Sequence, residues 1–108
     1  MSARRLNENE KQLIQRMLAG LSEGRDIVAS LDSYEVEEMN DGGMGSLRVV
    51  APNKYNRKFG NVLAECELKD EDGVPILVSI FLDSQGKLFE LDVWKVDFSA
   101  RKGPFKLT

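Results

Sequence analysis

The chain has 108 residues, of which 42% are hydrophobic and 31% are charged, a length and balance typical of a single globular domain over residues 1–108. It has no histidine and one cysteine, Cys66, which excludes a Ser-His-Asp triad, a Cys-His pair, an internal disulfide and a histidine- or cysteine-based metal site. The formal net charge is −3, and acidic residues dominate 26–51 and 61–97, which disfavours binding to nucleic-acid phosphates.

No apolar run approaches the roughly 20 residues of a membrane span, and no apolar segment follows the basic N-terminal residues as in a secretion signal. We therefore expect a cytoplasmic protein that binds no membrane, no nucleic acid and no cofactor.

The ends of the chain, 1–6 and 100–108, are expected to be flexible tails. The first predicted element is an amphipathic helix over about residues 8–22. Asn7 can cap this helix, and Glu10 three residues later completes a capping-box pattern. The apolar side chains of the helix fall on one stripe: Leu13, Ile14, Met17, Leu18 and Leu21. One face of this helix is therefore expected to be buried.

Residues 26–31 fit either a further helical turn or a short strand. A strand is predicted over 33–39, a turn over 40–46 and a second strand over 47–51. The three glycines of the turn indicate positive φ or a close backbone approach. A phosphate-binding loop is disfavoured because no lysine is present and a strand follows instead of a helix.

After a polar loop over 52–60, three strands are predicted, joined by turns at 70–73 and 83–86. In the last hairpin the expected pairs are Leu82 with Lys87, Ile80 with Phe89, Val78 with Leu91 and Ile76 with Val93. In the hairpin before it they are Leu68 with Val74, Cys66 with Ile76 and Ala64 with Val78. Apart from Leu82 with Lys87, these pairs place apolar residues on one face. The predicted fold is α+β: the N-terminal helix packs on one face of an antiparallel sheet of about five strands in hairpin, or meander, order.

The opposite sheet face combines acidic and aromatic side chains. Its candidate interaction residues are Phe81, Glu90, Asp92 and Trp94. A solvated face is the simplest explanation of alternation in an antiparallel strand, and a carboxylate acid/base pair or a hard-metal site is an alternative. Exposed aromatic residues beside carboxylates favour an interaction surface.

Four motifs occur in order along the chain: D-G-G-M-G-S-L-R at 41–48, F-G-N-V-L-A-E at 59–65, D-E-D-G-V at 70–74 and E-L-D-V-W-K-V-D-F-S at 90–99. This order resembles a family of small bacterial proteins classed as a domain of unknown function, whose members end in a similar E-L-D-x-W-K-x-D-F-S segment. The resemblance covers most of the chain and implies no catalytic residues. The small α+β form is also similar in style to immunity proteins that neutralise bacterial toxins, a likeness that does not supply function.

The leading hypothesis is a non-enzymatic protein-binding module, of immunity or accessory type, that presents its acidic and aromatic face to a protein partner. The alternative is a binder of a small anionic ligand, or a minor enzyme, with a pocket between helix and sheet. In that case Arg48, Lys54, Tyr55 and Arg57 would hold the ligand. A third hypothesis is a homodimer formed through the same mixed face.

Overall fold

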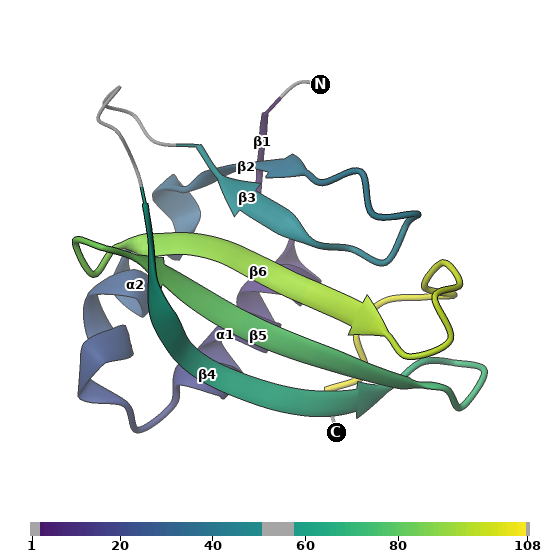
Figure 1. Ribbon diagram of the computed structural model, residues 1–108. Helices are drawn as coiled ribbons and strands as arrows, with labels where there is room; N and C mark the ends of the chain where they lie inside the picture. The colour runs from purple at the N-terminus through teal and green to yellow at the C-terminus, as the bar shows by residue number, and fades with distance from the viewer. Residues whose placement is uncertain (1–2, 51–57, 108) are drawn as a thin grey trace.

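The computed structural model describes residues 3–50 and 58–107 and shows a twisted antiparallel sheet with the helices gathered on one face (Figure 1). In chain order the elements are β1 (Arg4–Arg5), α1 (Glu8–Leu18), α2 (Arg25–Ala29), β2 (Glu35–Glu38), β3 (Leu47–Val49), β4 (Phe59–Lys69), β5 (Pro75–Asp83) and β6 (Leu88–Lys95). Two 3-10 turns, Ser22–Gly24 and Leu31–Ser33, flank α2. The predicted α+β class fits this architecture.

The order of the strands corrects the predicted meander. Within the described residues the sheet has six strands in the order β1-β2-β3-β6-β5-β4, so β3 pairs with β6, and β4 forms the far edge. The additional strand is β1, whose two residues pair with β2 inside the segment expected to be a tail. Alternation of apolar residues defines the two faces of each strand, but it carries no information about which strand lies beside β3.

The N-terminal helix begins as predicted, with a complete capping box at Asn7. The Asn7 side chain accepts from the Glu10 N–H at 2.8 Å, and the Glu10 carboxylate accepts from the Asn7 N–H at 2.9 Å. Helix α1 ends at Leu18, earlier than predicted, because Ala19 leaves the helical conformation and Gly20 has a φ of +82°. Of the two alternatives for residues 26–31, the structure shows the helical one, since α2 ends at Ala29.

The core lies between the sheet and a layer made of more than one helix, which corrects the prediction that the N-terminal helix alone covers the sheet. Helix α1, helix α2 and the C-terminal segment all bury apolar side chains there, as does Leu31 between α2 and β2. Fully or nearly fully buried residues of this layer are Leu13, Ile14, Leu18, Ile27, Leu31 and Phe105, and those of the sheet are Val36, Leu47, Val49, Ile76, Val78, Ile80, Leu82, Leu88, Leu91 and Val93.

The predicted pairing of β4 with β5 is wrong by two residues. Leu68 lies opposite Ile76, and Cys66 lies opposite Val78. The turn is centred one residue later than the predicted pairing requires: the Asp70 N–H donates to the Val74 carbonyl at 3.0 Å, and Gly73 takes a φ of +81°. Because the side chains of a strand alternate with a period of two, this shift leaves the predicted inward face unchanged.

The last hairpin differs from its predicted register for two separate reasons. A tight turn closed by the Asp83 N–H and the Lys87 carbonyl at 2.8 Å places Leu82 opposite Leu88, and a bulge at Phe89 then displaces the pairing by one further residue. Ile80 therefore lies opposite Leu91 instead of Phe89. Leu88 is buried and Phe89 is half-buried, the reverse of the prediction near the turn.

The C-terminal segment after β6 packs back onto α1. The Asn9 side chain accepts from the Phe105 N–H at 2.8 Å and donates to the Phe105 carbonyl at 3.0 Å. Within residues 3–50 and 58–107, no helix is long and apolar enough to cross a membrane.

Candidate functional site

The sheet face turned away from the helices brings the four predicted interaction residues together on β5 and β6. Phe81 lies opposite Glu90, and Trp94 lies opposite Leu77. Asp92 lies between Glu90 and Trp94 on the same face of β6, since Leu91 and Val93 point into the core. We call this surface the outer face.

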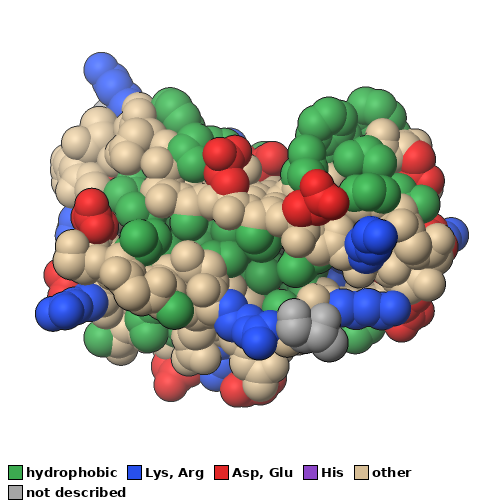
Figure 2. All heavy atoms as spheres, turned by 90° about the horizontal axis from the view of Figure 1, so that it is seen from below, with side chains coloured by type: hydrophobic (Ala, Val, Ile, Leu, Met, Phe, Trp, Pro, Cys, Tyr) green, Lys and Arg blue, Asp and Glu red, His purple; other side chains and the backbone are tan. Residues whose placement is uncertain are grey.

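Two aromatic pairs stand on the outer face. Trp94 contacts Phe98 with ring centroids 5.8 Å apart, and Phe59 contacts Phe81 with centroids 5.2 Å apart. Trp94 is 41% exposed, Phe98 71% and Phe59 57%. Viewed from the β4 side, hydrophobic side chains gather on two raised parts of the surface, with a hollow between them and carboxylates beside the hollow (Figure 2). Large exposed aromatic side chains of this kind are typical of interaction surfaces.

Polar side chains between the aromatic pairs give the outer face an acidic character. Asp92 is half-buried; burial raises the pKa of its carboxyl, and the nearby Glu90 and Asp41 carboxylates raise it further. Glu90 forms an ion pair with Arg48 at 2.9 Å, whereas Asp92 forms no ion pair in the described part of the chain. A partner with cationic groups would relieve the repulsion that Asp92 experiences.

A third carboxylate, Glu65 on β4, extends this acidic row. The Ser79 hydroxyl lies opposite Asp92 and donates to the Glu65 carboxylate at 3.3 Å. Within residues 3–50 and 58–107, however, no group of three or more Cys, Asp or Glu side chains is placed to hold a metal ion. The row of carboxylates can attract a positively charged surface.

Of the four residues proposed for the anionic-ligand alternative, the structure describes only Arg48, and it lies apart from the helix-sheet space. Arg48 is on β3, facing outward to Glu90, with its guanidinium 5.3 Å from the Phe89 ring centre. Lys54, Tyr55 and Arg57 lie outside the described residues. A cavity between α1 and the sheet does occur, but its basic side chains are Arg4 and Arg101.

A buried ionic cluster around Lys95 was not predicted from the sequence. This lysine is fully buried, and its Nζ lies 2.6 Å from Asp72 Oδ2, 3.0 Å from Asp70 Oδ2 and 3.3 Å from the Ala100 carbonyl. Asp70 also accepts the Lys102 N–H at 2.7 Å; these donors and the Lys95 charge outweigh the effect of burial and hold the pKa of Asp70 at about 2. The cluster joins the β4–β5 turn to the C-terminal segment.

A signal for Lys95 was present in the sequence. Lys95 follows Leu91 and Val93 at alternate positions of β6, so it belongs to the inward face and needs a buried counter-charge. The acidic turn containing Asp70 and Asp72 supplies that charge. Because the Lys95 Nζ contacts two carboxylates and a carbonyl and is fully buried, we interpret the cluster as structural.

A comparison with family models matches residues 3–103 to DUF6984, a domain of unknown function. The chain belongs to the DUF6984 family. The family match includes the whole of the described outer face and the ionic cluster, together with Arg101. Searches of curated proteins and of solved structures each found no match. Because the family description names no activity, function has to be argued from the side chains themselves.

Proposed function

We propose that this DUF6984 protein is a binding module whose outer face captures a protein with a basic surface. The observation that carries the proposal is the placement of two aromatic pairs, Trp94–Phe98 and Phe59–Phe81, on either side of the Asp92 carboxylate, which forms no ion pair with a described residue. Aromatic side chains supply most of the binding energy in such interfaces, and charges around them select the partner.

The electrostatics of the outer face favour a different protein over a second copy of this chain. Two copies that met through this face would bring Asp92, Glu90 and Glu65 of each copy together, and like charges brought together cost several kcal/mol. A basic surface, such as that of an enzyme acting on phosphate backbones, would instead pair with these carboxylates. This supports the immunity or accessory role over the homodimer.

Trp94 provides the natural reporter for a test because it is the single tryptophan of the chain. A photo-crosslinking amino acid at Phe98, beside Trp94, would capture the partner from host lysate. The captured protein would then be purified and its affinity measured by the change in Trp94 fluorescence at increasing salt. We expect a basic partner whose binding weakens as salt increases.

Paired variants decide whether the outer face is responsible. Binding by Trp94→Ala combined with Asp92→Ala, measured by calorimetry, should weaken by at least about 30-fold, as for the loss of one aromatic hot spot worth about 2 kcal/mol. The matched control Glu23→Ala removes one exposed carboxylate from the 3-10 turn Ser22–Gly24 and should bind as the wild type does. Equal affinity of the double variant and the control, or a partner without a basic surface, would refute the proposal. So would light scattering that shows a dimer disrupted by the same double variant.

A further inference from the structure

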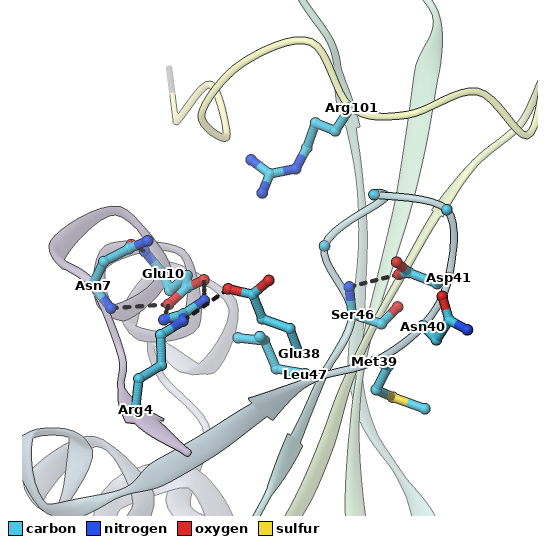
Figure 3. Close-up of a pocket in the computed structure, with 13 residues that line it drawn as sticks. Arg4, Asn7, Glu10, Glu38, Met39, Asn40, Asp41, Ser46, Leu47 and Arg101 are labelled. Atoms are coloured by element: carbon cyan, nitrogen blue, oxygen red, sulfur yellow. Dashed lines mark hydrogen bonds and ion pairs between the residues drawn. The ribbon is translucent and has the colours of Figure 1, made fainter. Parts of the chain in front are cut away.

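A cavity of about 390 Å³ lies where the start of α1, the end of β2, the glycine-rich loop at 40–46 and the C-terminal segment meet. Figure 3 shows Asn7 and Glu10 on one wall, Asp41 and Ser46 on the opposite wall, and Arg101 reaching into the space from the C-terminal segment. The volume is within the range of small-molecule sites. None of the residues that define the candidate interaction set on β5 and β6 lines this cavity.

The Arg101 guanidinium is held in place by neutral groups. Its Nε donates to the Met44 carbonyl at 3.1 Å, its Nη1 donates to the Gly103 carbonyl at 2.7 Å, and the group lies 4.0 Å from the Phe105 ring centre. In the described part of the chain Nη2 donates no hydrogen bond, and no carboxylate lies within ion-pair distance of Arg101. One edge of a fixed cation is therefore available to a ligand.

The carboxylates around the cavity are already engaged by other groups. Glu10 accepts two hydrogen bonds from Arg4, at 2.8 and 2.9 Å, and Glu38 accepts a third at 3.0 Å. The two oxygens of Asp41 accept the N–H groups of Met44 and Ser46 within its own loop, at 3.1 and 2.8 Å. Among the described residues, the positive charge of Arg101 thus has no direct counterpart, and burial lowers its pKa more than the more distant carboxylates raise it.

The loop beside Arg101 adds neutral donors. The N–H groups of Gly42, Gly43 and Gly45 donate no hydrogen bond to any other described residue, and all three glycines have positive φ. Gly45 also permits the close approach of Arg101, because a Cβ at this position would lie 2.9 Å from Nη2. Backbone amides beside an arginine are a common arrangement for binding an oxyanion.

We propose that this cavity binds a small monoanionic ligand whose carboxylate or phosphate group pairs with the free edge of Arg101. The carboxylates of Glu10, Glu38 and Asp41 line the same cavity, so additional negative charge on the ligand is opposed. Polyphosphates and nucleic acid are accordingly poor ligands. The site is independent of the outer face, since the two use different side chains.

Titration of the ¹⁵N-labelled full chain, followed by NMR at constant ionic strength, tests the proposal. The probes are acetate, lactate, inorganic phosphate and tripolyphosphate, with sodium chloride as the reference. We expect saturable chemical-shift changes of the Gly42, Gly43 and Gly45 amides and of the Arg101 Nε–H. These changes should occur with a carboxylate probe, with inorganic phosphate, or with both. The probe that binds more tightly identifies the class of ligand. Tripolyphosphate should bind more weakly than inorganic phosphate.

The variant Arg101→Gln should weaken binding of the responding probe at least tenfold, whereas Arg25→Gln, an exposed arginine on α2 outside the cavity, should leave it unchanged. Shifts that grow linearly without saturation, match those produced by chloride, or spread over surface lysines would overturn the proposal. Unchanged binding by Arg101→Gln would also overturn it. If Arg101→Gln does not fold, the wild-type shift map alone decides, because only a built site gives a saturable change confined to these groups.

Discussion

Replacing Asp70 by asparagine tests the energetic role of the Lys95 cluster. The Asp70 carboxylate accepts three hydrogen bonds: from Lys95 Nζ at 3.0 Å, from the Lys102 N–H at 2.7 Å and from the Glu71 N–H at 2.8 Å. An asparagine can offer only one carbonyl oxygen, and its NH₂ group would face at least one of these donors. A buried donor left without a partner costs about 1–3 kcal/mol, and loss of one member of a buried ion pair costs about 3–5 kcal/mol.

The expected value lies at the lower end of this range because Lys95 retains two other partners. Asp72 Oδ2 remains 2.6 Å from Nζ, and the Ala100 carbonyl remains at 3.3 Å. We therefore predict that Asp70→Asn lowers the free energy of unfolding by about 3 kcal/mol at neutral pH. The measurement is urea unfolding followed by the fluorescence of Trp94, which adjoins Lys95 in the chain.

Two further variants make the measurement specific to the cluster. Lys95→Met removes the buried cation, and the double variant Lys95→Met with Asp70→Asn should be less destabilised than the sum of the two single variants, by at least about 1 kcal/mol. Asp26→Asn, an exposed carboxylate on α2, should change stability by less than about 0.5 kcal/mol. A cost of Asp70→Asn similar to that of this control, or strict additivity in the double variant, would refute the reasoning.

Three other outcomes follow from local contacts. The pKa of Asp70 in the folded chain, about 2, lies below its ordinary value of 3.8, so the unfolded chain binds the proton first as the pH falls. The stability advantage of the wild type over Asp70→Asn should therefore be complete above about pH 5 and disappear between about pH 4 and pH 2. Urea unfolding at each pH measures this difference. Asn7→Ala removes the acceptor of the Glu10 N–H and should cost about 1 kcal/mol in the same assay, whereas Asn7→Ser should largely restore stability. Gly60→Ala would place a Cβ 2.3 Å from the Asp83 carbonyl and should destabilise by about 2 kcal/mol or more; a wild-type unfolding curve would contradict that contact.

The two hairpins illustrate which features of a sheet can be predicted from one sequence. Both turns have an aspartate followed three residues later by glycine, Asp70 with Gly73 and Asp83 with Gly86, and in both the glycine has positive φ while its N–H donates to the aspartate carbonyl. This is the chemistry of a type I turn followed by a left-handed glycine, and it specifies a three-residue loop. A three-residue loop after Asp70 predicts the observed register of β4 with β5. The bulge at Phe89 has no comparable signal, since nothing in the local sequence distinguishes the displaced residue.

The strand order depended on contacts that are distant in sequence. Short strands such as β1 and β3, with two and three residues, carry too little alternation to be assigned neighbours from pattern alone. The pairing of β3 with β6 is instead reinforced by side chains: the Ser46 hydroxyl accepts the Val93 N–H at 2.8 Å and donates to the Val93 carbonyl at 3.2 Å. Such a contact links residues 47 positions apart, and only the folded chain reveals it.

The errors in register and strand order did not affect the prediction that the candidate interaction residues share one face. The cavity could not be predicted. A register shift of two residues exchanges neighbours but keeps every side chain on its own face, so Phe81, Asp92 and Trp94 share the outer face in either register. The cavity, in contrast, requires Arg101 to fold back across the glycine-rich loop, and that path depends on the burial of Phe105 against α1. A side chain that lies in a segment without periodicity gives no pattern from which its destination can be predicted. For this chain, faces follow from alternation, while sites assembled by irregular segments follow only from the tertiary fold.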